Sequence, residues 1–237
     1  MGTDLFIDGG RPEVSRSPIN KSVPDTVPEQ LLKVDVFGSV WRMGDTVVRN
    51  ANAARPWARK LARYLLRREH RALTRLALGK GIVGVPRVLN LQAGMLTRSW
   101  IEATPMHLAK PRDPAYFRAA ARLVRKLHAA NVIHNDLAKE TNWLVRPDGR
   151  PALVDFQLAM TLTKRNVLTR ALGHDDIRHL LKHKRTYLPN KLTSRERGIL
   201  ATPSLPSRVW MASGKKIYLF VTREILHWRD REGAGDR

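Results

Sequence analysis

The sequence predicts an α+β protein in which a small β-sheet with one helix precedes a mainly helical second half. Three observations support this class. Short apolar stretches separated by turn residues fill much of the first hundred residues, around one long helical pattern. The second half contains several helical patterns. Among the helical patterns of that second half, a strand-like run precedes Asp136 and another apolar run ends at Asp155.

The first hundred residues predict strands around one helix. Residues 31–50 predict two short strands with turns at Gly38 and at 43–45, and residues 84–103 predict two more. Between them lies a basic helix over 56–78. Its leucines recur at helical spacing and predict its buried side: Leu61, Leu65, Leu66, Leu73 and Leu76. The predicted order is therefore β-β-α-β-β.

The second half begins with a predicted helix over 113–131. Asp113 is the expected N-cap, Pro114 occupies the first helical position, and Asn131 is the expected C-cap. The apolar face of this helix is expected to consist of Phe117, Ala120, Ala121, Val124 and Leu127. A hairpin around a Pro-Asp-Gly turn follows, and Asp155 stands at the end of its second strand. Further helices are predicted near 174–184 and within 192–200.

These patterns divide the chain into three expected parts. Residues 1–30 are rich in Pro, Ser, Gly and Asp without periodicity, and we expect a flexible arm. Residues 31–102 form the sheet-containing part, and residues 103–237 the mainly helical part with a basic tail. Residues 220–232 in that tail predict a docked helix, with a membrane-surface helix as the alternative.

The charge balance points to anionic partners. There are 43 Lys and Arg against 21 Asp and Glu, a formal net charge of +22. Such a surface attracts nucleic acid, anionic lipid head groups or phosphorylated ligands, although a basic face can also be simply solvated. The absence of Cys excludes disulfides and Cys-ligated zinc. We expect no signal peptide, and no apolar run approaches the roughly 20 residues of a membrane span.

Three polar residues in the second half match the needs of phosphoryl transfer. That chemistry needs oxygen ligands for metal ions, a carboxylate that orients the attacking hydroxyl, and a cation for the remaining phosphates. Asp136 and Asn142 lie on one loop, and Asp155 ends the hairpin that follows. A loop and a hairpin can bring all three together. The alternative is that these side chains only cap turns.

Residues 134–145, HNDLAKETNWLV, and 154–159, VDFQLA, resemble the catalytic loop and metal-binding segment of the protein-kinase-like superfamily. Small size and basic character make the chain most similar to the atypical bacterial branch of lipopolysaccharide-core kinases and RIO-like kinases. The resemblance covers roughly residues 34–190. It implies a bilobal protein-kinase-like fold, with a small β-sheet N-lobe and a reduced, mainly helical C-lobe, that uses ATP and Mg²⁺.

The resemblance also implies roles in the second half. Asp136 would be the catalytic base, Asn142 and Asp155 the Mg²⁺ ligands, and His134 a residue that braces the loop. Lys139 would touch the γ-phosphate, or be a solvated loop lysine. The Asp in HDDIRHLL, Asp176, is similar to the helix aspartate that braces the catalytic loop from below.

On the nucleotide side, the resemblance places Arg49 where the family has its phosphate-binding lysine. Glu69 follows 20 residues later and is expected to pair with Arg49 or, alternatively, with a neighbouring arginine of its own helix. Gly38 would represent the glycine-rich loop over the phosphates, and residues 95–102 the hinge against adenine.

The chain departs from the family pattern at several positions. Arg49 replaces lysine, Gln157 replaces the glycine of the D-F-G motif, and Gly38 is the single glycine where a glycine-rich loop is expected. The catalytic loop is one residue longer, because Asn142 is six residues after Asp136. Only 20 residues separate Asp155 from Asp176. That leaves no room for a full activation segment and favours the atypical branch.

The sequence therefore predicts an ATP-dependent kinase that phosphorylates a hydroxyl of a sugar, a lipopolysaccharide-type acceptor or a protein Ser/Thr. Two alternatives stay open. The departures allow a pseudokinase-like ATP-binding or scaffold module, and the charge allows a basic RNA- or ribosome-associated factor. Charge and resemblance together indicate a cytoplasmic protein with peripheral contact at the inner membrane face.

Overall fold

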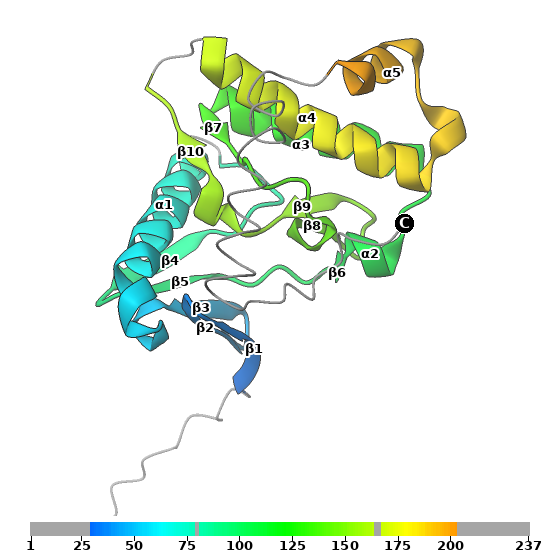
Figure 1. Ribbon diagram of the computed structural model, residues 1–237. Coiled ribbons are helices and arrows are strands. Elements are labelled where there is room, and N and C mark those ends of the chain that lie inside the picture. The colour runs from blue at the N-terminus through cyan, green and yellow to red at the C-terminus, as the bar shows by residue number, and fades with distance from the viewer. Residues whose placement is uncertain (1–28, 79–80, 164–166, 203–237) are drawn as a thin grey trace, which may run out of the picture.

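The computed structural model describes residues 29–78, 81–163 and 167–202. Five strands and a long helix form its N-terminal side, and a mainly helical region follows (Figure 1). The fold is α+β and kinase-like, as the sequence predicted. Residues 1–28 of the predicted arm and the predicted tail helix over 220–232 lie outside the described residues, whereas residues 29 and 30 of that arm belong to the first strand.

The larger sheet contains five antiparallel strands. Their spatial order is β1 (Glu29–Asp35), β2 (Gly38–Met43), β3 (Thr46–Asn50), β5 (Met95–Ser99) and β4 (Val88–Gln92). The prediction of two strands over 31–50 is wrong, because both predicted turns separate full strands and the region contains three. The two strands predicted over 84–103 are confirmed as β4 and β5.

Gly38 allows β2 to start close to the end of β3. Its φ is 125°, and a Cβ at this position would lie 2.1 Å from the carbonyl oxygen of Asn50. No other residue type fits that approach without moving the backbone. The turn before Gly38 is short, and the carboxylate of Asp35 accepts the N–H of Phe37 at 2.8 Å.

Helix α1 (Arg59–Ala77) follows a 3-10 turn over Pro56–Ala58 and contacts β4 and β5. Its buried side repeats at intervals of three and four residues: Ala62, Leu65, Leu66, Glu69, Ala72, Leu73 and Leu76. Four of the five predicted leucines are buried. The expectation for Leu61 is wrong, because its side chain lies on the flank of α1 and is 46% exposed.

The C-terminal region contains α2 (Met106–Ala109), α3 (Pro114–Ala129), α4 (Val167–Tyr187) and α5 (Ser194–Ala201). Asp113 caps α3 as predicted, since its carboxylate accepts the N–H of Ala115 at 2.7 Å. The expected C-cap is one residue off: Ala130 is the C-cap, and Asn131 follows it with a left-handed φ of 57°. Helices α3 and α4 pack against each other (Figure 1).

Short strands connect the helices to the sheet region. The predicted hairpin is present as β8 (Trp143–Val145) and β9 (Pro151–Leu153), and β6 (Thr104–Pro105) pairs with β8. Strand β7 (Val132–Ile133) pairs with β10 (Met160–Thr161). These pairings hold residues 131–143 beside residues 153–161, so the two segments with the predicted site residues are neighbours.

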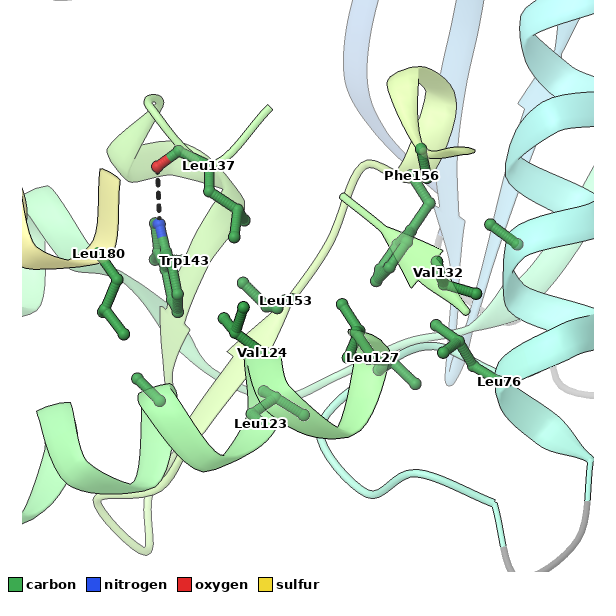
Figure 2. Close-up of a cluster of buried hydrophobic side chains, with 14 of the residues drawn as sticks. Leu76, Leu123, Val124, Leu127, Val132, Leu137, Trp143, Leu153, Phe156 and Leu180 are labelled. Carbon is green, nitrogen blue, oxygen red and sulfur yellow. Dashed lines mark hydrogen bonds between the residues drawn. The ribbon is translucent and has the colours of Figure 1, made fainter. Parts of the chain in front are cut away.

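The main core lies between α1, α3, α4 and the hairpin. Figure 2 shows Leu127 of α3 and Leu76 of α1 around Val132 and Phe156. In the same cluster the indole N–H of Trp143 donates a hydrogen bond to the carbonyl oxygen of Leu137 at 3.0 Å. One apolar cluster therefore anchors both segments that carry the predicted site residues.

Candidate active site

Each of the three predicted phosphoryl-transfer residues is followed by a buried anchor. Asp136 precedes Leu137, Asn142 precedes Trp143, and Asp155 precedes Phe156. All three anchors have no exposed surface. Neighbouring side chains diverge along an extended or loop backbone, so an apolar anchor in the core aims the preceding polar side chain away from the apolar cluster. The three buried anchors thus fix the positions of the polar residues that precede them.

The catalytic-loop candidates contact one another directly. The amide Nδ2 of Asn142 donates to the carbonyl oxygen of Asp136 at 2.8 Å and to its Oδ2 at 3.0 Å. The ammonium of Lys139 lies 3.2 Å from the same Oδ2. A 3-10 turn over Glu140–Asn142 leads the longer loop back so that Asn142 faces Asp136. The structure therefore brings Asp136, Lys139 and Asn142 together.

Asp176 on α4 braces this loop. Its carboxylate accepts the backbone N–H groups of His134 and Asn135, both at 2.9 Å, and its Oδ2 lies 2.9 Å from Nε2 of His128. Asn135 has a left-handed φ of 62°, a conformation that needs such support. The bracing contact expected from Asp176 is present, whereas the contribution of His128 was not anticipated.

His134 connects the loop to the hairpin. Its side chain is fully buried, and Nε2 lies 3.0 Å from the carbonyl oxygen of Val154. Its ring centre is 4.5 Å from that of Phe156. In addition, the N–H of Val154 donates to the carbonyl oxygen of Asn142 at 3.1 Å. Asp155, the next residue, is thereby held beside the loop, and these contacts are those expected of a bracing His134.

The other half of the site comes from the sheet and α1. Arg49 on β3 pairs with Leu96 on β5, and Val47 pairs with Arg98. Paired residues and residues two apart share a face of a sheet, so these four side chains point the same way. Val47 and Leu96 are fully buried. The two arginines on that face are therefore directed toward the interior.

Glu69 of α1 meets both arginines. Its Oε2 lies 3.3 Å from Nε of Arg49, and its Oε1 lies 3.2 Å from Nε of Arg98. Glu69 has no exposed surface. The predicted ion pair between Arg49 and Glu69 is thus present, and Arg98 is a second partner that the sequence reading missed.

Arg49 also joins this cluster to the catalytic segment. Its Nη2 lies 3.4 Å from Oδ1 of Asp155, so Arg98, Glu69, Arg49 and Asp155 form a chain of alternating charge. Asp155 has a left-handed φ of 63°, which is uncommon for a non-glycine residue. We name Arg49, Glu69 and Arg98 the charged triad. The triad carries two positive charges and one negative charge, and the carboxylate of Asp155 supplies the second negative charge.

The two aspartates have opposite pKa shifts. Burial alone would raise the pKa of Asp155, but the charges of Arg49, Lys139 and Arg98 outweigh it and hold this pKa below its ordinary value. Burial raises the pKa of Asp136, and the charge of Asp155 adds to this, although Lys139 opposes it. Asp155 therefore stays ionised to a lower pH than Asp136 does. Asp136 is the better suited of the two to take up a proton.

The two arginines also differ. Burial works against the charge of both, yet the pKa of Arg49 is raised because Glu69 and Asp155 both stabilise its charge. The pKa of Arg98 is lowered by burial and by the nearby charge of Arg49, with Glu69 as its main opposing partner. Arg49 is thus the better compensated cation, and it is the one that faces the catalytic segment.

A family comparison agrees with this geometry. The model of the RIO domain matches residues 34–196 of the 237 residues. The chain belongs to the RIO domain family. RIO domains are an atypical protein-kinase-like family of ATP-binding phosphotransferases, which is the general fold and activity that the sequence predicted. No curated protein matches the chain. The finer likeness to lipopolysaccharide-core kinases stays a prediction.

The remaining predicted residues of this RIO domain lie around the same site. The hinge candidate, residues 95–102, consists of β5 and the stretch after it, where the indole of Trp100 donates to Glu102 at 2.9 Å and stacks under Arg42 at 4.3 Å. Gly38 stands at the start of β2, beside Asn50 at the end of β3, and Asn50 directly follows Arg49 in the sequence. Contact of either segment with a nucleotide stays a prediction.

The oxygen atoms present suit a magnesium ion that is held jointly with phosphates. Asp155 offers an ionised carboxylate and Asn142 an amide oxygen, and Mg²⁺ prefers such hard ligands with near-octahedral geometry. Among the described residues, no group of three or more His, Asp or Glu side chains could hold a metal alone. A metal at this RIO domain would therefore take the rest of its coordination from phosphates and water.

Two concave regions lie away from the aspartates. A groove of about 690 Å³ between α1 and the β4–β5 turn is lined by Asn52, Arg63, Leu66, Arg67 and residues 91–94. A smaller one of about 190 Å³ lies where the chain leaves β5, lined by residues 102–104, Ala109 and residues 145–147. Neither includes Asp136 or Asp155. The chemistry of the site is therefore identified by its charges and hydrogen bonds.

Proposed function

We propose that this RIO domain is an ATP-dependent kinase that transfers the γ-phosphoryl group to a hydroxyl. The observation that carries the proposal is the arrangement of Asp136, Asn142 and Asp155, which are held together with oppositely shifted aspartate pKa values. A turn-capping role would need neither the shared contacts nor the link from Asp155 to the charged triad.

In the proposed reaction, Asp136 orients the acceptor hydroxyl and accepts its proton. A bond forms between the hydroxyl oxygen and the γ-phosphorus while the bond from that phosphorus to the bridging oxygen of ADP breaks. Asn142 and Asp155 would hold Mg²⁺, which supplies positive charge to the phosphate oxygens. Arg49 would hold the phosphates that are not transferred, and Lys139, whose ammonium lies 3.2 Å from Asp136, would meet the γ-phosphate.

For Arg49 to bind phosphates, its positive charge must not be fully neutralised by the carboxylate of Glu69. The second arginine, Arg98, shares the Glu69 carboxylate through the other oxygen. We infer that Arg98 is a positioning residue. It neutralises part of the Glu69 charge, so that Arg49 is directed toward Asp155 and the phosphates.

The acceptor is proposed at a coarser level. The net charge of +22 favours an anionic acceptor, such as a lipopolysaccharide-type sugar, over a neutral one, and a protein Ser/Thr is the second candidate. None of the described helices is long and apolar enough to cross a bilayer. We infer a cytoplasmic protein that reaches such an acceptor through peripheral contact with the membrane.

A pseudokinase that binds nucleotide without turnover is the second candidate function. It is favoured by the short turn at Gly38, which offers one glycine in place of a glycine-rich loop, and by the ion pair that already engages Asp155 with Arg49.

The test is Mg²⁺-dependent turnover of ATP by the full chain, with binding of a fluorescent ATP analogue measured in parallel. We expect turnover that disappears in Asp155→Asn and persists in Asp148→Asn, the same change in the exposed hairpin turn. Binding without turnover in the wild type, over a panel of sugar, lipid-linked and protein acceptors, would replace the proposal with the pseudokinase reading. If the chain neither binds the ATP analogue nor turns over ATP, both the kinase and the pseudokinase proposals are contradicted.

A further inference from the structure

One flank of α1 exposes large apolar side chains. Leu61 and Tyr64 are 46% and 51% exposed, and Trp57, in the turn that leads into α1, is 57% exposed. They follow one another at intervals of four and three residues, which places them along one side of a helix. Burying these side chains would be favourable, so a row of them in water is an unusual feature of a monomeric surface.

Arg68 links this row to a fourth exposed apolar residue, which lies near the active site. The guanidinium of Arg68 lies 5.8 Å from the ring centre of Tyr64 and donates to the carbonyl oxygen of Leu158 at 2.8 Å. Leu158 is 38% exposed and belongs to the 3-10 turn Phe156–Leu158 that directly follows Asp155. We name Trp57, Leu61, Tyr64 and Leu158 the α1 ridge.

The surroundings of the α1 ridge are positively charged. Lys60, Arg68 and Arg71 follow one another at helical spacing beside Tyr64, and Arg55 precedes Trp57. Arg68 is half-buried and the other three are exposed. Glu69 is the single acidic residue of α1, and its charge is buried between Arg49 and Arg98. The solvent side of α1 thus presents apolar and cationic groups without an acidic one.

This combination fits a lipid surface better than a nucleic acid. Trp and Tyr favour the boundary between water and acyl chains, leucine enters the apolar layer, and Lys and Arg attract anionic head groups. Binding of single strands instead relies on aromatic faces in a groove that follows the phosphate backbone. Two of the four ridge residues are leucines, which cannot stack on bases, and no ridge residue lines either of the two concave regions described above.

We propose that the α1 ridge docks this RIO domain onto an anionic lipid surface. The proposal gives a location to the peripheral membrane contact inferred above, and it holds whether or not the site turns over ATP. Because Leu158 lies three residues after Asp155, docking through the ridge would bring the site close to the head-group layer. A hydroxyl acceptor carried on a lipid would then lie close to the active site. An acceptor in solution would instead have to reach the site by diffusion.

The test is co-sedimentation of the full chain with vesicles of phosphatidylcholine, with and without phosphatidylglycerol. We expect binding only with phosphatidylglycerol, weakening as salt is added. Lys60→Glu with Arg71→Glu should lower the partition coefficient about tenfold or more. Leu61→Ser with Tyr64→Ser should lower it about tenfold as well, because the apolar contact is lost.

Matched controls separate the ridge from general charge and apolarity. Arg118→Glu with Arg122→Glu makes the same charge change on the exposed side of α3, and Leu89→Ser with Leu108→Ser removes equally exposed leucines elsewhere. Both controls should bind vesicles like the wild type. All variants change exposed side chains, and equal thermal unfolding midpoints would verify that they fold.

Several outcomes would overturn the docking proposal. These are absence of vesicle binding at low salt, equal losses in ridge and control variants, or binding of a single-stranded RNA that the ridge variants abolish while vesicles are not bound. Asp155→Asn should bind vesicles normally. Failure of turnover and failure of docking are therefore distinguishable.

Discussion

The two sides of the candidate site are built by different physics. The loop side, Asp136 and Asn142 with their brace Asp176, is held mainly by directional hydrogen bonds of 2.8–3.0 Å, many to backbone groups. The charged triad of Arg49, Glu69 and Arg98 is held by ion pairs of 3.2–3.3 Å in the interior. Among the described residues, Nε of both arginines and both oxygens of Glu69 lack an aligned hydrogen bond.

This difference explains how the charged triad can depart from the family pattern at Arg49 while the loop side keeps its Asp and Asn residues. A hydrogen-bonded loop tolerates few substitutions, because each donor has one defined acceptor. The stability of a buried group of charges depends mainly on the sum of its charges, and an arginine in place of a lysine keeps that sum. Arg98 adds a second cation beside Arg49 on the Glu69 carboxylate. The comparison predicts that the triad responds to changes of charge and the loop side to changes of hydrogen-bonding pattern.

The largest expected effect is the loss of the Glu69 charge. Glu69→Gln would leave Arg49 and Arg98 buried without their shared carboxylate, and we expect a loss of about 3–5 kcal/mol in the free energy of unfolding. Urea unfolding followed by circular dichroism measures it. Glu102→Gln removes the exposed partner of Arg42 and should cost less than about 1 kcal/mol. Similar costs for the two variants would show that the triad is not a buried charge cluster.

The next effect is on the loop brace. Asp176→Asn turns an amide N–H₂ toward a backbone N–H, so one donor loses its acceptor, and we expect a loss of about 2–3 kcal/mol together with slower turnover. Asp113→Asn is the matched control, because Asn caps a helix as well as Asp. If both variants unfold at the same urea concentration, Asp176 does not hold the loop as described.

A smaller effect is expected at Arg98. Arg98→Met leaves one oxygen of Glu69 without a cation, which should cost about 1–3 kcal/mol of stability. Because Glu69 would then act on Arg49 alone, the KM for ATP should rise more than kcat falls. Arg98→Lys keeps the charge and should retain more ATP affinity. Unchanged KM in Arg98→Met would remove Arg98 from the account of nucleotide binding.

The smallest effect is a shift in pH dependence. Asp136 must be ionised to accept a proton, so activity should fall as the pH drops through its raised pKa. The charge of Lys139 lowers that pKa, and Lys139→Gln should therefore raise it further and move the acid limb of kcat/KM to higher pH. Lys139→Arg should leave the limb in place. A shift of the limb to lower pH in Lys139→Gln would contradict the assignment of Asp136 as the base.

Sequence reading located the loop side because its signals are local. His134, Asp136 and Asn142 fall within nine residues, and apolar neighbours mark their anchors. It missed Arg98, whose partner Glu69 is on another element. The signal was available in the alternation of Leu96 and Arg98, which puts both on one face of β5. Without knowing that β3 pairs with β5, the sequence could not show that Arg98 and Arg49 share a carboxylate.

The fold was predicted well where periodicity was strong and poorly where it was interrupted. The long helix and the hairpin were placed to within a few residues. Residues 31–50 were instead assigned two strands, although both predicted turns separate strands and only two residues lie between successive strands there. Helix α4 begins before its predicted start. It continues through Gly173, a residue that usually weakens helices and that here lies against the ring of His128. These errors arise because tertiary contacts outweighed local preference.

The most direct test of the account is the Mg²⁺-dependent turnover of ATP by Arg49→Lys. If the site works through a guanidinium that reaches both Glu69 and Asp155, a lysine keeps the charge but loses one of the two contacts. Turnover should then fall about tenfold to a hundredfold. A large gain in turnover would contradict the account, because it would mean that Arg49 marks a degraded phosphate site and not a rebuilt one.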